Sequence, residues 1–137
     1  DFEFEYNFYG NFVFTGSGSY VRGKDTEAGS NLPLIPPLKG RLGLRYSYHN
    51  LGSAEFTVTG VAKQTKIAQS EQETDGYIRL DMAMGSEKIA LGKTGLQIFA
   101  GIDNITNTSY ANHLSTNRGS ISVEPGRNFY IRMNFSF

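Results

Sequence analysis

The stretch DFEFEYNFYGNFVFTGSGSY, residues 1–20, decides the predicted fold. From residue 2 to residue 8, every second side chain is aromatic, and the side chains between them are acidic or amide. Strict alternation of this kind is typical of a β-strand with one apolar face and one polar face. Gly10 lies in a short break at residues 9–11, where a glycine favours a tight turn. We therefore predict a hairpin of two strands, residues 1–8 and 12–22.

The same period of two continues along most of the chain. It predicts five further strands, at residues 38–49, 54–67, 77–86, 95–102 and 126–137. The connections alternate between short ones (9–11, 50–53 and 87–94) and long ones (24–37, 68–76 and 103–125). The prediction is an all-β chain of about seven antiparallel, up-and-down strands.

The lengths of these strands favour a transmembrane β-barrel. Ten residues at about 3.3 Å each, tilted by about 45°, cover roughly the 25 Å apolar band of an outer-membrane barrel. Strands of soluble domains are usually nearer five or six residues. We expect the apolar faces to meet lipid, the polar faces to line the lumen, and the long loops to lie outside the cell. Phe137 is then expected at the periplasmic end.

The number of strands argues against a closed barrel made by this chain alone. Bacterial single-chain barrels have an even number of strands, with a minimum of eight. Seven strands leave two edges with unpaired backbone groups, which lipid does not tolerate. Either residues 120–123 form a further short strand, or the chain is part of a larger barrel.

Composition and motifs exclude several classes of function. The 13 basic and 13 acidic side chains balance, whereas nucleic-acid binders normally carry a basic surplus. With no cysteine, the chain has no disulfide and no thiolate metal site. His49 and His113 are far apart in the sequence, and no catalytic, metal-binding or phosphate-binding motif surrounds them. We predict no enzyme activity, no catalytic residue, no metal site and no cofactor.

Three stretches resemble the C-terminal end of TonB-dependent outer-membrane receptors. They are NLPLIPPLKGRLGLRY (residues 31–46), GLQIFAGIDNITNTSYANHLS (95–115) and EPGRNFYIRMNFSF (124–137). The first is similar to the family's Pro-rich loop exit into a strand. The second is similar to its penultimate strand with a following Asp-Asn pair, and the third to its closing strand with a terminal Phe. Together they cover about half of the 137 residues.

The resemblance implies that residues 1–137 are the C-terminal portion of a plugged barrel of about 22 strands. The plug, and the N-terminal segment that contacts TonB, are absent from the chain. The implied function is TonB-energised uptake of a scarce nutrient across the outer membrane of a Gram-negative bacterium. Siderophore-bound iron, haem, cobalamin and metal chelates are the implied ligand classes. The implied partners are outer-membrane lipid, the TonB complex and the ligand.

Two groups of polar residues are candidates for the functional site. Tyr110 and His113 offer a phenol and an imidazole for ligand contact, although the surrounding Asp and Asn side chains favour local turn structure. Lys39, Arg41 and Arg45 form a basic row expected to face the lumen. This row could steer an anionic chelate or pair with a plug carboxylate, but pairing with Glu3, Glu5 and Glu55 in the barrel wall is favoured. Arg127 is expected to be structural.

Three acidic residues and two alternative architectures complete the predictions. Glu71, Glu73 and Asp75 are expected in a solvated loop, in preference to a cation site. One alternative is a complete small eight-stranded outer-membrane barrel. The other is a soluble all-β binding module whose aromatic faces line an internal core.

Overall fold

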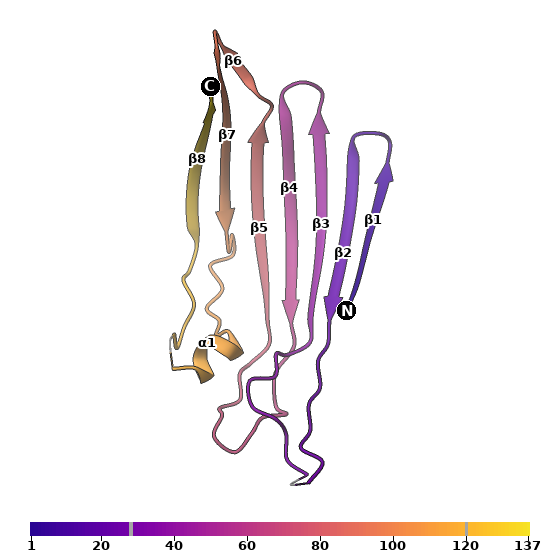
Figure 1. Ribbon diagram of the computed structural model, residues 1–137, viewed down its shortest axis with the longest axis vertical. Coiled ribbons are helices and arrows are strands. Elements are labelled where there is room, and N and C mark those ends of the chain that lie inside the picture. The colour runs from indigo at the N-terminus through magenta and orange to yellow at the C-terminus, as the bar shows by residue number, and fades with distance from the viewer. Residues whose placement is uncertain (28, 120) are drawn as a thin grey trace.

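The computed structural model describes residues 1–27, 29–119 and 121–137 of the chain. Its strands form one antiparallel sheet in the order β1-β2-β3-β4-β5-β7, with β6 and β8 both paired to β7 (Figure 1). The strands are β1 (Phe2–Phe8), β2 (Phe12–Ser19), β3 (Lys39–Tyr48), β4 (Gly52–Val61), β5 (Tyr77–Ser86), β6 (Ile89–Leu91), β7 (Thr94–Asp103) and β8 (Asn128–Ser136). A short helix, α1 (His113–Asn117), lies in the last long loop.

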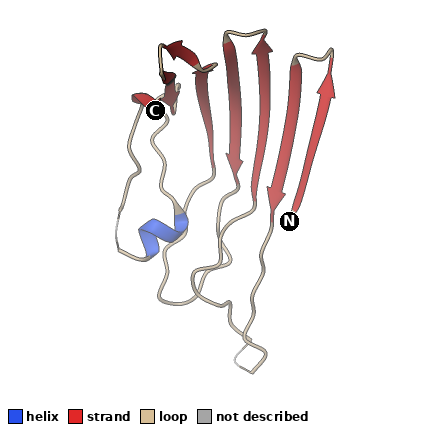
Figure 2. Ribbon diagram, turned by 45° about the horizontal axis from the view of Figure 1, so that its top comes forward, coloured by secondary structure: helices blue, strands red, loops and turns tan. Residues whose placement is uncertain are grey.

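The sheet is a single curved layer (Figures 1 and 2). The long loops gather at one end, and the short turns and the C-terminus lie at the other (Figure 1). Among the described residues, no apolar side chain is buried. The accessible surface is 9519 Å², whereas a compact monomer of this mass exposes about 7,100 Å². The sheet therefore has no core of its own.

Register aligns the apolar side chains on one face of the sheet. Phe14 lies opposite Leu44, and Leu44 lies opposite Phe56. At the edge of the sheet formed by β8, Ile131 pairs with Ala100 and remains 71% exposed. Because these side chains are exposed, an apolar environment outside the chain must cover them.

An aromatic ladder crosses this apolar face at the end with the short turns. Phe8 stacks on Phe12 with ring centroids 5.2 Å apart, and Phe12 lies 4.6 Å from Tyr46. Tyr48 continues the ladder at 6.2 Å from Tyr46. Aromatic girdles of this kind mark the membrane–water interfaces of outer-membrane barrels.

The seven long strands are found where alternation predicts them, with different ends. The strand predicted at 12–22 ends at Ser19, because its partner β3 begins only at Lys39, after two prolines that lack a backbone donor. The strand predicted at 54–67 runs from Gly52 to Val61, and its register with β3 and β5 ends there.

Two predicted connections contain regular structure. Residues 87–94, predicted as a turn, include β6, which extends the hairpin with β7. Residues 103–125, predicted as irregular, include α1, whose first turn is capped by the side chain of Asn112. Ser120 lies outside the described residues, and residues 121–123 form no strand. The described residues contain no helix long and apolar enough to cross a membrane.

Both alternative architectures disagree with this structure. In the described residues, β1 and β8 are opposite edges of an open sheet and do not pair, so no small closed barrel forms. The aromatic faces do not line an internal core, because none of the described apolar side chains is buried.

Candidate functional site

The predicted basic row lies on the polar face of β3. Arg41 is in register with Ser17 and Thr59, and Arg45 is in register with Glu55. Arg41 Nη2 lies 3.9 Å from Glu55 Oε1, and their side chains are 57% and 37% exposed. An ion pair this exposed contributes little stability. The geometry agrees with the favoured wall pairing for Arg41 and Glu55, whereas within the described part of the chain Glu3 and Glu5 form no ion pair with the row.

The three members of the row have different surroundings. Lys39, at the loop end of β3, lines a hollow of about 170 Å³ together with Tyr77, Asn112 and His113. Arg45, on the same face but nearer the short turns, lines a larger hollow of about 410 Å³ with Glu55 and Arg132. Arg132 in turn lies 4.8 Å over the ring of Phe99. The structure thus brings Lys39 and His113 to one hollow, and leaves Arg45 outside it.

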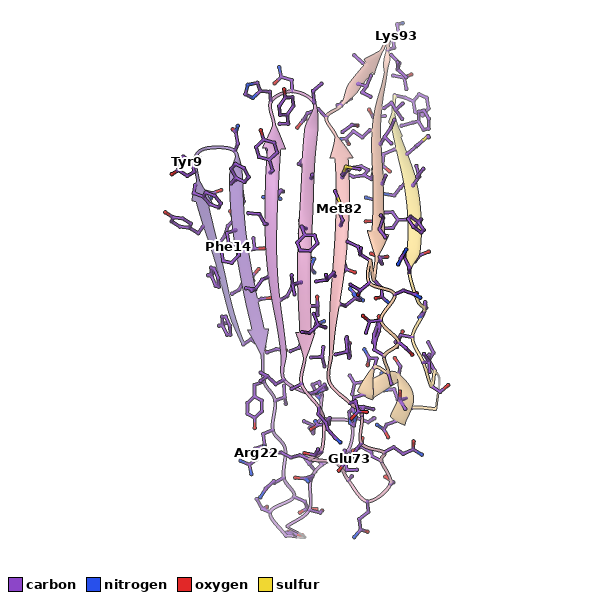
Figure 3. The ribbon with its side chains drawn as sticks, turned by 180° about the vertical axis from the view of Figure 1, so that it is seen from behind. Tyr9, Phe14, Arg22, Glu73, Met82 and Lys93 are labelled. Carbon is purple, nitrogen blue, oxygen red and sulfur yellow. The ribbon has the colours of Figure 1, made fainter. Side chains whose placement is uncertain are left out.

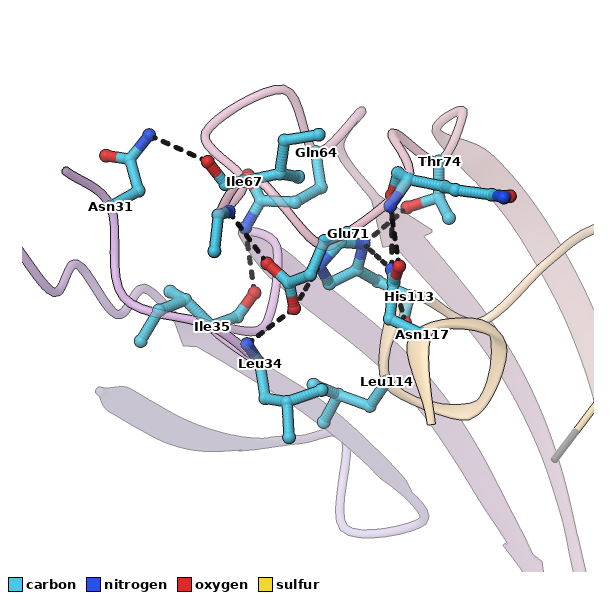
Figure 4. A network of polar contacts seen from close by, with 12 residues as sticks. Asn31, Leu34, Ile35, Gln64, Ile67, Glu71, Thr74, His113, Leu114 and Asn117 are labelled. Atoms are coloured by element: carbon cyan, nitrogen blue, oxygen red, sulfur yellow. Dashed lines mark hydrogen bonds and ion pairs between the residues drawn. The ribbon is translucent and has the colours of Figure 1, made fainter. Parts of the chain in front are cut away.

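A network of polar contacts, which we call the loop network, joins the three long loops (Figure 4). Its centre is Glu71, whose side chain is only 5% exposed. Glu71 Oε1 accepts a hydrogen bond from Leu34 N at 2.6 Å, and Oε2 accepts one from Ala68 N at 3.0 Å. The prediction of a solvated Glu71 was wrong, because these backbone donors from two loops bind its carboxylate inside the network.

His113 belongs to the same network and is 3% exposed. Its Nδ1 lies 3.0 Å from Thr74 Oγ1 and 3.1 Å from Asn117 Nδ2. Asn117 Nδ2 also donates to the backbone oxygen of His113 at 3.0 Å, which fixes the amide beside the ring. Nε2 faces Glu71 Oε1 at 3.9 Å and has no hydrogen-bond partner among the described atoms.

Amide side chains complete the loop network. Gln64, 7% exposed, donates to Ile35 O at 2.8 Å and forms a backbone bridge with Thr74. Asn117 accepts from Gln72 N at 2.7 Å and donates to Gln72 O at 3.1 Å. Hydrogen bonds therefore tie the three long loops to one another.

Tyr110 anchors the last loop to the polar face of the sheet. Its ring stacks on Tyr77 at 4.2 Å, and its hydroxyl accepts a hydrogen bond from Arg79 Nη1 at 3.2 Å. Arg79 Nη2 also pairs with Asp81 Oδ2 at 2.9 Å. Asp81 Oδ1 then accepts from Asn104 N at 2.9 Å.

Asn104 begins the loop and is 1% exposed. Its side chain accepts from Thr108 N at 2.9 Å and donates to Thr108 O at 2.8 Å. This confirms the expectation that an Asn in this stretch binds backbone groups within a turn. Downstream, Asn107 Oδ1 accepts from Arg127 N at 2.9 Å.

The remaining acidic residues of the second loop pair with one lysine. Lys63 Nζ lies 3.4 Å from both Glu73 Oε2 and Asp75 Oδ1. Hydrogen bonds to Glu73 and then Asp75 hold the pKa of Lys63 above its ordinary value of 10.5. Within the described residues, no group of three His, Cys, Asp or Glu side chains is arranged to hold a metal ion.

Sequence reasoning did not single out several residues of these networks. Gln64, Thr74 and Asn117 are ordinary polar loop residues, and their partners lie up to 45 positions away. Arg79 and Asp81 carry a usable signal, since they are side chains of opposite charge at neighbouring positions on the polar face of a predicted strand.

The comparisons with known proteins agree with one another. A family model described as "TonB dependent receptor-like, beta-barrel" matches residues 1–105. Among solved structures, the chain is similar to "Copper transporter OprC", with 28% sequence identity and a TM-score of 0.84. That match covers 97% of this chain and 22% of the transporter chain, so the chain spans about a fifth of that length. No curated protein matches the chain.

Proposed function

The chain belongs to the TonB-dependent receptor β-barrel family, and on that premise we propose that residues 1–137 form the C-terminal portion of a receptor's barrel wall. The predicted resemblance and the all-β fold are confirmed. The chain is an outer-membrane protein segment of a Gram-negative bacterium, and the comparisons indicate a receptor and transporter, not an enzyme.

One observation carries the proposal of a barrel wall. The sheet is a single layer that exposes an apolar face on one side and a polar face on the other, with no apolar core among the described residues. An environment with lipid on one side and a hydrated lumen on the other satisfies both faces. The match to 22% of a larger transporter chain supports a wall completed by strands outside these residues.

We propose that the whole receptor imports a scarce nutrient in a TonB-dependent step. The structural similarity to a copper transporter supports a cargo that contains a metal, either as an ion or as a chelate. Siderophore-bound iron, haem and cobalamin stay as predictions within the same class of scarce ligands. Contact with TonB is assigned to a region of the receptor outside the 137 residues.

Within this function, the loop network would hold the extracellular loops as one unit. Tyr110 and His113 are engaged with Arg79, Thr74 and Asn117, so we propose that they position the loops through which a ligand passes. Direct ligand contact by Tyr110 and His113 stays a prediction. Lys39 is proposed as a cation at the lumen side of the loops, where it would attract an anionic chelate.

Cellular metal uptake tests this function. Cells carrying the whole receptor as their sole receptor of this kind are grown with limiting copper or iron, and accumulated metal is measured by mass spectrometry. We expect accumulation of one metal to fall to background when TonB is deleted. Lys39→Ala should raise the metal concentration needed for half-maximal uptake, while Lys93→Ala, at the opposite end of the sheet (Figure 3), should leave it unchanged. Uptake that is independent of TonB would overturn the proposal.

A further inference from the structure

A hollow on the outer side of the sheet lies where β2, β3 and β4 give way to the loops. We call it the rim hollow, with a volume of about 190 Å³. The wall next to the strands is apolar and includes Leu38 and Ala62. These two residues and Tyr20 continue the alternation of the lipid-facing rows, one step beyond the row of Gly18, Gly40 and Gly60. The rim hollow therefore lies at the edge of the membrane, on the side with the long loops.

The wall that the loops form in the rim hollow is cationic. Arg22, Lys63 and Lys66 line it, and no acidic residue is among its described lining residues. Lys63 is partly neutralised by its two carboxylate partners in the second loop. Lys66 Nζ lies 6.0 Å over the ring of Tyr20, and neither it nor Arg22 has an acidic partner within 4.0 Å in the described structure. A net positive charge therefore surrounds the hollow.

Hydrogen bonds from two amide side chains hold the walls of the rim hollow in place. Gln64 donates to Ile35 O, and Asn31 donates to Ile67 O at 3.3 Å. Ala62 N donates to Leu38 O at 2.9 Å at the base. Because the two loops are fixed to each other, the cations on both are presented over one site.

Next to the rim hollow, on the side toward the short turns, the lipid face has an open strip. A Cβ added at Gly60 would meet no atom within 4 Å, and one added at Gly40 would meet only the backbone oxygen of Ser17 at 3.9 Å. The ring of Phe2 covers Gly18 on one side of the strip, and Ile78, paired with Gly60, borders it on the other. A hydrocarbon chain running along the barrel wall fits this strip.

We propose that the rim hollow and the glycine strip together bind a phosphorylated lipid of the outer leaflet. The phosphate would lie between Arg22 and Lys66, and an acyl chain would cross β3 and β4 over Gly40 and Gly60, which lie opposite each other. Cationic side chains at a membrane surface attract anionic headgroups, and long cationic side chains extend to the interface with their aliphatic stems over apolar surface. The strip of open backbone, in line with the cations, favours a lipid over a soluble phosphate.

Binding of lipid A to the purified whole receptor tests this proposal. The delipidated receptor is titrated in detergent with bis-phosphorylated lipid A, and bound lipid is counted by native mass spectrometry. We expect the Arg22→Ala/Lys66→Ala variant to bind at least about tenfold more weakly than wild type. Gly60→Leu should also weaken binding by filling the strip, and its Cβ would meet no atom within 4 Å. The matched control, Lys88→Ala/Lys93→Ala, removes two cations at the opposite end and should bind like wild type.

Several results would overturn the proposal. One is equal affinity of the Arg22→Ala/Lys66→Ala variant and wild type. Another is equal binding of lipid A from which both phosphates have been removed. Inorganic phosphate that competes as well as the lipid would identify a soluble phosphate as the ligand. Gly60→Leu that binds lipid A with wild-type affinity would show that the glycine strip holds no acyl chain. A receptor dimer that occupies the site and excludes lipid would assign the surface to a second copy.

Discussion

Replacing Glu71 by alanine should release the three loops from one another. The carboxylate accepts hydrogen bonds from Leu34 N in the first loop and Ala68 N in its own loop, at 2.6 and 3.0 Å. It also faces Nε2 of His113 in the third loop at 3.9 Å. Alanine leaves both backbone donors without a partner in a site where the glutamate side chain is only 5% exposed.

The size of the effect follows from these two hydrogen bonds. A hydrogen bond to a charged group contributes about 1.5–3 kcal/mol, so Glu71→Ala should cost about 3–6 kcal/mol of loop-network stability. Local opening of the loops should then become about 10²–10⁴ times more frequent. Glu73→Ala, in the same loop, removes an exposed ion pair and should cost at most about 1 kcal/mol.

Amide hydrogen exchange on the whole receptor measures this opening directly. Protection of the amides in residues 31–38, 64–74 and 113–118 should fall together in Glu71→Ala and stay near wild type in Glu73→Ala. If only the amides next to residue 71 exchange faster, the loops do not act as a unit. If both variants behave alike, the buried carboxylate is not the centre of the network.

Three further predictions concern other parts of the chain. An arginine at the lipid-facing position Leu42 or Ile131 should lower the free energy of unfolding by about 2–4 kcal/mol in reversible lipid-vesicle unfolding, and a wild-type value would contradict the assigned face. Asn104→Ala should destabilise the start of the last loop by about 2–4 kcal/mol, because both Thr108 backbone groups lose their partner and alanine disfavours the φ of 53°. Asn104→Gly removes the same hydrogen bonds but tolerates this φ, so its amide hydrogen exchange should be slower than that of Asn104→Ala. An NMR titration should give Lys63 a pKa above 10.5, and this pKa should return toward 10.5 in the variant Glu73→Gln/Asp75→Asn. The stabilisation from this ion pair should be present below pH 10.5 and disappear as the pH rises through the raised pKa of Lys63.

Alternation along the chain was enough to predict most of the sheet. Residues 2–8 place aromatic and polar side chains on opposite faces, and residues 128–136 separate apolar from polar side chains with Tyr130 as the exception, because each face of a barrel wall meets a different solvent. β6 was missed because it has only three residues beside a turn. Helix α1 was missed because five residues show no apolar period, although Asn112 is a capping signal that could have been used.

The loop network could not be predicted from the sequence. Glu71 binds Leu34 across 37 positions, and Thr74 meets His113 across 39. These contacts depend on the sheet bringing three loop ends together, and no local pattern records them. Likewise, Tyr110 and His113 were chosen for their chemistry, whereas their burial among Arg79, Thr74 and Asn117 is a property of the folded loops.

The central claim is that this sheet is a wall between lipid and an aqueous lumen, and spin-label scanning of β3 tests it most directly. The 137 residues contain no cysteine, so single cysteines can be placed and labelled one by one at residues 39–48 of a whole receptor whose other cysteines have been replaced. In lipid vesicles, labels at Leu42, Leu44 and Tyr46 should be accessible to oxygen dissolved in lipid. Labels at Arg41, Arg45 and Ser47 should be accessible to a water-soluble nickel chelate. An inverted pattern, or one without a period of two, would contradict the account.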